Sequence, residues 1–170
     1  MVDLNMTKEA PRQQFWGVLR QVHAGMLGLE GSRQHMQPMA PYPDPERSLI
    51  WFFTKTDSDL FKQLSERSLA RFCFIGPNHD YHASVAGTLH ENRDAAQIDK
   101  MWNQIVAAWF EGGQADPRLT LLAMNLHDAA IWASVGNPLA FGWEIAKAHV
   151  KDEEPDVGLR AHVKFDRAEA

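Results

Sequence analysis

Little in this sequence supports a disulfide-stabilised, membrane-spanning or nucleic-acid-binding protein. Cys73 is the only cysteine among 170 residues, so no disulfide can form within the chain, and a reducing compartment is expected. No apolar run approaches the ~20 residues that span a bilayer, and residues 1–12 carry no apolar signal core. The net charge of -5 disfavours nucleic-acid and anionic-membrane partners, which require a basic face. These absences predict a soluble, cytoplasmic protein.

Sequence motifs for nucleotide binding, metal binding and nucleophilic catalysis are also missing. No glycine-rich phosphate loop is present. The segment His79-Asp80-Tyr81-His82 crosses a turn, and no second cluster completes a ligand set, so no metal site is expected. Ser84 and Ser134 lack the context of a nucleophile elbow, and Cys73 has no histidine at a typical spacing. The catalytic residues therefore stay unassigned.

Aromatic residues, in contrast, are abundant. The chain contains six tryptophans and nine phenylalanines. Such a content suits an aromatic core, and it also suits a slot for a planar ligand, so composition leaves both interpretations open. The length fits one domain, which can bury roughly two-thirds of its unfolded surface without a disulfide or metal.

Period-two alternation predicts most of the strands. Residues 70–74 and 81–89 alternate on either side of Gly76-Pro77-Asn78, which predicts an antiparallel hairpin. The prolines within residues 41–45 predict a break in extended structure. Further strands are predicted over residues 24–29, 35–40, 48–54, 119–126 and 129–133.

Helical spacing is clearest after the hairpin. Apolar residues from Ile98 to Trp109 predict one helix that begins at Asn92 or Asp94 and ends at Gly112-Gly113, with Trp102 and Trp109 facing the core. The charged segment after Val150 predicts a loosely attached tail. Other helices are predicted over residues 11–23, over 56–64 and from Asn137-Pro138 onward.

The order of these elements predicts a mainly β fold with flanking helices, of the α+β class. Tight hairpins favour an antiparallel barrel over a parallel sheet, which requires regular strand–helix alternation. The predicted domain covers residues 1–150, and residues 151–170 form the charged C-terminal tail.

Three segments, in this order, carry a resemblance to a known family. They are Gln37-Pro38-Met39, then Trp51-Phe52-Phe53-Thr54 followed by Asp57-Ser58, and then Trp102-Asn103 to Trp109-Phe110-Glu111-Gly112-Gly113. Their order and spacing resemble the FMN-binding split barrels related to pyridoxamine phosphate oxidase, particularly the subgroup called general stress proteins. Weaker agreement comes from Val85-Ala86-Gly87 and Ala130-Ile131-Trp132.

The resemblance, which covers residues 15–150, implies an antiparallel split barrel with FMN at a homodimer interface. Phe52 and Phe53 would line the slot of the flavin ring, and Trp132 would approach the ring from the second subunit. Thr54 and Ser58 would hydrogen-bond to the ribityl chain and phosphate. The cofactor-binding residues implied in this way are Gln37, Pro38, Met39, Phe52, Phe53, Thr54, Ser58, Leu60, His82, Ser84 and Trp132.

The chain departs from the family at two cationic positions. Gln37 stands where relatives carry arginine, and Leu60 stands where they carry a phosphate-binding lysine. Each lost hydrogen bond to a charged group removes about 1.5–3 kcal/mol, which corresponds to tenfold or more in affinity. Arg33, Lys55 and Lys62 are near enough in sequence to replace these cations.

These residues support three hypotheses for function. The first is a flavin-dependent oxidoreductase of unknown substrate, in which the cofactor carries the redox chemistry. The second is a non-catalytic protein that stores or senses FMN during stress. The third, favoured by Gln37 and Leu60, is a dimeric split barrel that has lost its cofactor.

Overall fold

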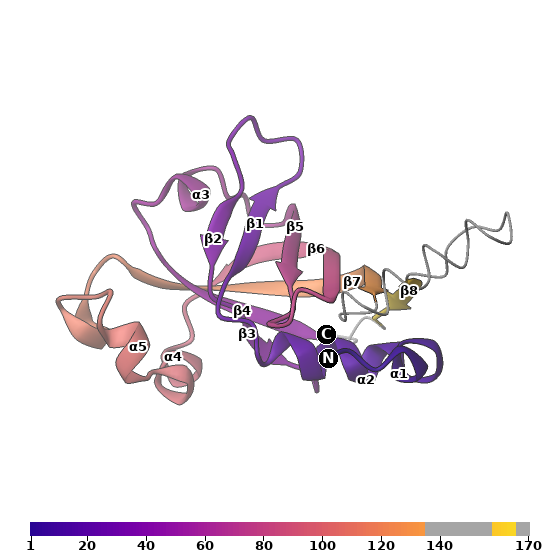
Figure 1. The fold of residues 1–170 in the computed structure, drawn as a ribbon. Helices are drawn as coiled ribbons and strands as arrows, with labels where there is room; N and C mark the ends of the chain where they lie inside the picture. The colour runs from indigo at the N-terminus through magenta and orange to yellow at the C-terminus, as the bar shows by residue number, and fades with distance from the viewer. Residues whose placement is uncertain (135–157, 166–170) are drawn as a thin grey trace, which may run out of the picture.

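One antiparallel sheet, curled into a half-barrel, organises the chain (Figure 1). The structure is a computed structural model that describes residues 1–134 and 158–165. The strands lie in the order β2-β1-β5-β6-β7-β4-β3, and β8 also pairs with β7. The predicted mainly β class with flanking helices is therefore confirmed. The strands are β1 (Gly25–Leu29), β2 (Gln37–Met39), β3 (Tyr42–Asp44), β4 (Leu49–Lys55), β5 (Ser68–Ile75), β6 (Tyr81–Asn92), β7 (Leu119–Ser134) and β8 (Gly158–Lys164).

The helices are short and lie outside the sheet, and two of them pack against its two sides (Figure 1). Pro11 begins α2, as predicted from its fixed φ and missing N–H. No helix in the described residues is long and apolar enough to cross a membrane. The helices are α1 (Leu4–Glu9), α2 (Pro11–Leu19), α3 (Asp59–Lys62), α4 (Ala95–Met101), α5 (Gln104–Ala107) and the 3-10 helix η1 (Gly113–Ala115).

The β5–β6 hairpin forms as predicted. Phe72 pairs with Val85, and both are fully buried on the inner side of the half-barrel. Their alternation with outward-facing Arg71 and Ser84 is the period-two pattern seen in the sequence. This hairpin supplies the middle of the inner core.

Strand β7 joins the two parts of the sheet. One edge of it pairs with β6, while its other edge pairs first with β4 and then with β8. The register shifts at Ala86/Gly87, where β6 passes from Asp128 to Leu126 and leaves His127 as the extra residue of a bulge. A Cβ on Gly87 would lie 2.4 Å from the Asn125 carbonyl oxygen, so only glycine allows this approach. The two strands predicted over residues 119–126 and 129–133 are therefore one bent strand.

The proline-rich segment is a strand, which corrects the predicted break. Tyr42, Pro43 and Asp44 pair with Trp51, Ile50 and Leu49 of β4. Strand β3 lies at the end of the strand order, and an edge strand tolerates proline because its outer N–H groups need no partner.

The long helix predicted after the hairpin is also wrong. It is interrupted by Trp102, which has extended backbone, and by Asn103, whose side chain accepts hydrogen bonds from the backbone N–H groups of Ile105 and Val106. Asparagine competes with the helix backbone in this way and begins a new helix, α5. Trp109 consequently has 70% of its surface exposed instead of facing the core.

The predicted loose tail contains a paired strand. Residues 158–164 form β8 along the second half of β7, and Val163 is buried in the inner core. Phe165 is buried too, with its ring 5.3 Å from Phe15 and 5.6 Å from Trp16 of α2. The tail prediction is thus corrected for residues 158–165, and the helix predicted from Asn137-Pro138 lies outside the described residues.

Two apolar cores occupy the two sides of the sheet. The inner core fills the half-barrel, and α2 packs against it through Phe15, Trp16 and Leu19. A smaller outer core lies over β4 and the first half of β7, where Ile98 and Met101 of α4 pack against it. Within the described part of the chain, the outer side of β5, β6, β8 and the second half of β7 has no such cover.

Candidate functional site

The connection from β4 to α3 brings two hydroxyl groups together. Thr54 Oγ1 lies 3.2 Å from Ser58 Oγ. Ser58 is the N-cap of α3, and its Oγ accepts a hydrogen bond from the Phe61 N–H at 3.3 Å. Serine is favoured at this position because it satisfies a helix N–H that has no backbone partner. These hydroxyls form the polar part of the site at this end of the half-barrel.

Gln37 lies on the inner side of β2, because it alternates with Pro38 and shares a face with the buried Met39. The β1–β2 connection contacts α3 through Ser32, whose Oγ lies 2.6 Å from Gln63 Oε1. The β1–β2 connection therefore lies beside the C-terminal end of α3, in the same region of Figure 1. The Gln37 side chain is partly exposed and can reach a ligand, whereas Met39 packs into the core.

Leu60 belongs to the inner core. Only 4% of its surface is exposed, and it packs with the buried residues of the half-barrel. A side chain in this position closes the end of the barrel and is screened from solvent. This corrects the prediction that Leu60 faces a bound phosphate.

Phe52 and Phe53 point to opposite sides of β4, as neighbours in a strand must. Phe52 has no exposed surface and packs against Phe72 in the inner core, with the ring centroids 5.1 Å apart. Phe53 is partly exposed on the outer side, in edge contact with Tyr42 and Trp102. One planar ligand cannot lie against both rings, so the predicted role of Phe52 as a wall of the slot is wrong for this conformation.

The three cations predicted as replacements do not gather at Thr54 and Ser58. Lys55 alternates with Thr54, and its Nζ lies 5.7 Å from the centroid of the Phe110 ring on the outer side. Lys62 Nζ is 4.0 Å from Asp59 on the surface of α3. Arg33 is exposed in the β1–β2 connection. The hydroxyl pair is therefore without a cation from these positions.

The other predicted residues lie on the uncovered outer side of the sheet, which we call the open face. His82 of β6 is directly opposite Trp132 of β7, and Ser84 follows on the same side. Trp132 is 44% exposed, and the guanidinium carbon of Arg160 lies 5.5 Å from its ring centroid. The large exposed apolar side chains of the open face are Met26, Leu69, Ile75 and Trp132.

Sequence reasoning missed the contribution of β8 to this face. Arg160, His162 and Lys164 are exposed and alternate with Leu159, Ala161 and Val163, which point inward. The alternation was visible in the sequence, but the many charges around it concealed the strand.

The histidine-containing turn does not form a ligand cluster. His79 has a φ of 59° in the turn, and His82 points out from the open face. Asp80 lies buried between them, where its Oδ2 accepts a hydrogen bond from the Val2 N–H at 2.6 Å. The side chains of His79, Asp80 and His82 therefore lie in three different environments and do not converge.

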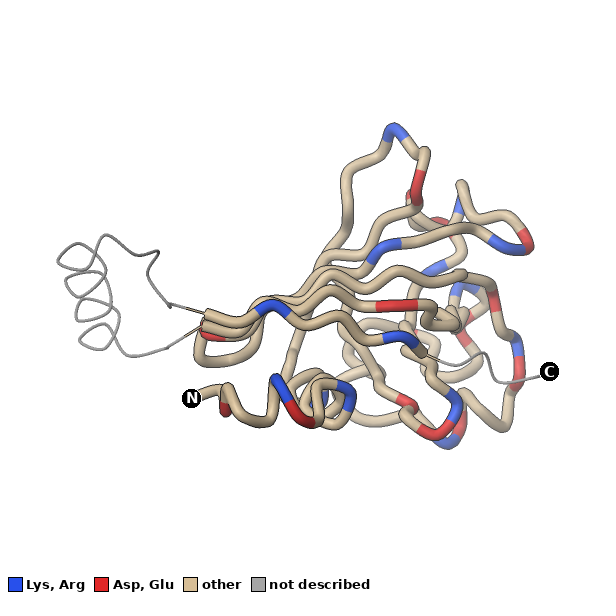
Figure 2. The backbone as a smooth tube through the Cα atoms, turned by 90° about the vertical axis from the view of Figure 1, so that its right-hand side faces the viewer, with Lys and Arg blue, Asp and Glu red and all other residues tan. Residues whose placement is uncertain are grey.

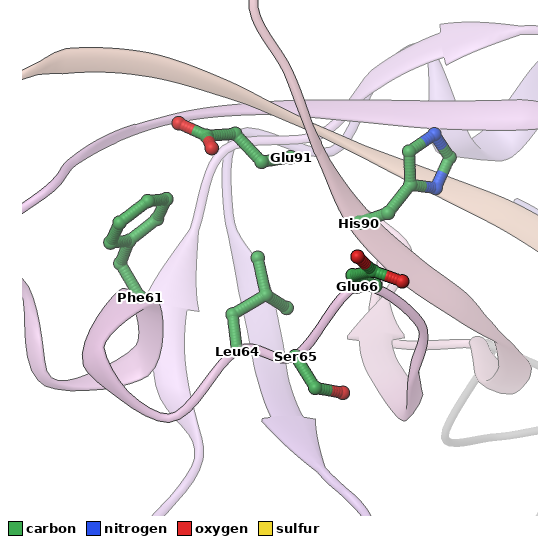
Figure 3. A pocket seen from close by; sticks show the side chains of 6 residues that line it. All are labelled: Phe61, Leu64, Ser65, Glu66, His90 and Glu91. Carbon is green, nitrogen blue, oxygen red and sulfur yellow. The ribbon is translucent and has the colours of Figure 1, made fainter.

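A separate pocket of ≈ 340 Å³ lies beside α3 (Figure 3). Burial opposes the charge on Glu91, but hydrogen bonds from Arg93 and Thr120 hold its pKa below the ordinary value. Burial and the nearby Arg67 lower the pKa of His90. The two carboxylates in the lining do not suit a phosphate. The pocket is lined by Phe61, Leu64, Ser65, Glu66, His90 and Glu91.

The predicted site residues thus form two groups on opposite sides of the sheet. Gln37, Thr54 and Ser58 lie at the end of the half-barrel beside α3, while His82, Ser84 and Trp132 lie on the open face. A single chain does not bring the two groups around one ligand. Two copies can do so if the open face of one meets the α3 end of the other.

Comparison with known proteins agrees with this architecture. The sequence model of the family described as pyridoxamine 5'-phosphate oxidase like matches residues 10–156. General stress protein 26 from Jannaschia sp. CCS1 is 36% identical, with 92% of this chain and 99% of that chain covered and a TM-score of 0.74. A general stress family protein from Xanthomonas campestris pv. campestris is 37% identical, over 79% of this chain and 92% of that chain, with a TM-score of 0.68.

A third structure has a description that includes a ligand. It is the general stress FMN/FAD binding protein from Xanthomonas citri, which is 39% identical over 75% of this chain and 90% of that chain, with a TM-score of 0.67. No curated protein matches the chain. The matched segment extends from α2 through β7 and so includes both groups of candidate site residues.

Proposed function

Because the chain belongs to the pyridoxamine 5'-phosphate oxidase-like family, we propose that it binds FMN between two copies and acts as a flavin-dependent oxidoreductase. The observation that carries this proposal is the pairing of exposed Trp132 with His82 on the open face, beside Ser84. An exposed indole next to polar side chains offers a planar apolar surface and hydrogen-bond partners for a flavin ring. The 39% identical protein from Xanthomonas citri, described as FMN/FAD binding, supports the choice of ligand.

The residues present fit a flavin in part. Thr54 and Ser58 offer hydroxyl groups 3.2 Å apart, and Gln37 offers an amide on the same side of the sheet. These groups can donate hydrogen bonds to a phosphate, although none of them is charged. We therefore expect FMN to bind with a smaller advantage over riboflavin than a cationic phosphate site would give.

When bound, the flavin would supply hydride or electron transfer, and the chain would bind and orient it. Trp132 would limit the slot, and the Thr54–Ser58 pair would position the polar end. No acid–base residue of this chain is required for that role.

The division of the site into two groups supports a homodimer. Each chain supplies one group to each of two shared slots in this arrangement, which closes with two-fold symmetry. Cys73 is a free thiol, which supports a cytoplasmic location for this dimer.

The first experiment is the absorbance spectrum of the purified protein. A flavin spectrum, with the chromophore released as FMN on denaturation, is expected. A colourless protein that does not take up added FMN would favour the alternative of a split barrel without cofactor. Turnover of NAD(P)H with an artificial acceptor then distinguishes the oxidoreductase from a flavin-storing or flavin-sensing protein, which would bind without turnover.

A further inference from the structure

The pocket beside α3 forms where β6 is longer than its neighbour β5. Ser68, the first residue of β5, pairs with Leu89, so His90 and Glu91 of β6 extend beyond the end of β5. Residues of α3 and of the connection from α3 to β5 border the space beside them and complete the lining (Figure 3). A cavity of ≈ 340 Å³ is large enough to hold a small organic molecule.

One wall of this pocket is apolar. Phe61 and Leu64 are partly buried, and they pack against the inner core while they also line the pocket. Figure 3 shows both side chains directed toward β6, where Glu91 lies. An apolar body can pack against this wall. A cationic group attached to it can contact both the face of a phenyl ring and a carboxylate.

Few charged residues lie within the strands of the sheet (Figure 2), and Glu91 of β6 is one of them. Its Oε1 accepts hydrogen bonds from Thr120 Oγ1 at 2.7 Å and from Arg93 Nε at 2.9 Å. Although burial opposes the charge, these bonds hold the pKa of Glu91 below its ordinary value, so the carboxylate is ionised at neutral pH. Within residues 1–134 and 158–165, no hydrogen bond reaches Oε2. The fixed carboxylate therefore has one oxygen that a charged donor can use.

The charges around the pocket favour a cation over an anion. The lining contains a second carboxylate, Glu66, and no lysine or arginine. Burial and the nearby Arg67 lower the pKa of His90, so its ring adds no positive charge at neutral pH. Arg67 and Arg93 lie outside the lining and are exposed. Solvent and salt therefore screen their effect on a ligand inside the pocket.

We propose that this pocket binds a small arylalkylamine, at a site separate from the flavin slot. The ammonium group of the ligand donates a hydrogen bond to Glu91 Oε2 and lies against the Phe61 ring, while the apolar body packs on Leu64. Glu66 adds a second negative charge. None of the residues assigned to the flavin lines this pocket, so the inference goes beyond the proposed function and does not depend on it.

The test is isothermal titration calorimetry of the full chain with three ligands that share a phenyl ring and differ in charge. They are phenethylamine, phenethyl alcohol and hydrocinnamate, which are positive, neutral and negative at pH 7.5. A hydrogen bond between two charged groups is stronger than one from a neutral hydroxyl. We therefore expect the amine to bind about tenfold or more tightly than the alcohol, and the carboxylate to bind most weakly.

Two variants of the lining locate the binding. Glu91→Gln keeps an acceptor for Thr120 and should weaken amine binding about tenfold or more, with little change for the alcohol. Phe61→Leu keeps the wall apolar but removes the ring, and it should weaken amine binding about two- to tenfold. The matched control Glu9→Gln removes an exposed carboxylate on α1 and should keep the wild-type affinity. Circular dichroism establishes that each variant is folded.

The inference is overturned if the amine binds no more tightly than the alcohol, or if folded Glu91→Gln or Phe61→Leu keeps the wild-type affinity. Loss of amine binding in Trp132→Ala would place the amine in the flavin slot and would overturn it too. Amine binding by a protein that takes up no flavin would leave the inference intact and refute only the proposed function. The two failures are therefore distinguishable.

Discussion

Gln37 is the predicted site residue at which a single substitution tests the ligand most directly. It is partly exposed, lies on the inner side of β2, and stands where relatives carry arginine. A longer side chain can therefore be accommodated more easily at position 37 than at the buried positions of Met39 and Leu60.

We expect Gln37→Arg to tighten FMN binding about tenfold or more, since a hydrogen bond to a charged group contributes roughly 1.5–3 kcal/mol. Riboflavin, which has no phosphate, should bind with unchanged affinity. Fluorescence quenching titrations with both flavins measure the difference. Equal tightening for both ligands would show that Gln37 does not face the phosphate, and Gln37→Lys provides a matched cationic control.

Leu60→Lys should have the opposite consequence from the one implied by the family resemblance. Leu60 is 4% exposed in the inner core, and an unpaired buried charge costs about 3–5 kcal/mol. We expect a lower midpoint of chemical denaturation and no gain in FMN affinity. Lys62→Leu, on the exposed side of the same helix, is the control. A stable Leu60→Lys protein that binds FMN more tightly would show that this residue turns toward the ligand.

At the scale of elements, β8 connects the chain end to the core. Its inward residues lie against β7, and Phe165 directly after it contacts α2. This strand also supplies the outward cations of the open face. One short segment therefore contributes both to stability and to surface chemistry.

Phe165→Ala should destabilise the fold by about 3–5 kcal/mol, because it removes a buried ring that packs against both Phe15 and Trp16. The neighbouring Lys164→Ala removes an exposed side chain and should stay within about 0.5 kcal/mol of the wild type. Urea denaturation followed by tryptophan fluorescence compares the two variants. Similar midpoints would mean that β8 is not held against the core.

The connection from η1 to β7 contains a carboxylate, Asp116, whose pKa is lower in the folded chain than its ordinary value. The Asp116 side chain accepts hydrogen bonds from the Arg118 side chain and backbone N–H, which lower its pKa from 3.8 to about 2. Because the folded pKa is depressed, the stabilisation is present above pH 4 and disappears as pH falls toward 2. Asp116→Asn should therefore lower the thermal midpoint at pH 7 and matter less near pH 2. A midpoint difference that is independent of pH would contradict this linkage.

At the scale of the whole molecule, the two groups of candidate residues require two chains. His82 and Trp132 lie on the open face, while Thr54 and Ser58 lie beside α3. If the slot is shared between two chains, two variants with defects in different groups can complement each other, whereas a slot within one chain does not allow this.

Mixing two variants that each fail to bind flavin should restore part of the binding. Trp132→Ala removes a residue of the open-face group, and Ser58→Ala/Thr54→Val removes the hydroxyls of the other group. If the slot is shared, a mixed dimer holds one intact slot and one with both defects, so about a quarter of all slots recover after random exchange of subunits. Flavin absorbance after co-refolding measures this recovery. No recovery, despite mixed dimers shown by mass spectrometry, would place both groups in one chain's slot.

The sequence by itself determined the local elements. Alternation identified β5 and β6, Pro11 located the start of α2, and the spacing of three segments indicated the family. These signals lie within short stretches, where the period of the apolar residues and the fixed φ of Pro11 act without distant partners. Asn103 was a similar local signal for the start of a helix. The helical spacing of the apolar residues on both sides of it suggested one continuous helix and so masked that signal.

Only the tertiary structure decided which side of each strand is covered. The sequence pattern does not say that Phe52 packs on Phe72, that Leu60 closes the barrel end, or that β8 pairs with β7. These outcomes depend on contacts between segments far apart in the chain, because a strand buries whichever face meets another element. The same packing leaves the open face uncovered by residues 1–134 and 158–165, and it separates the candidate site into two groups.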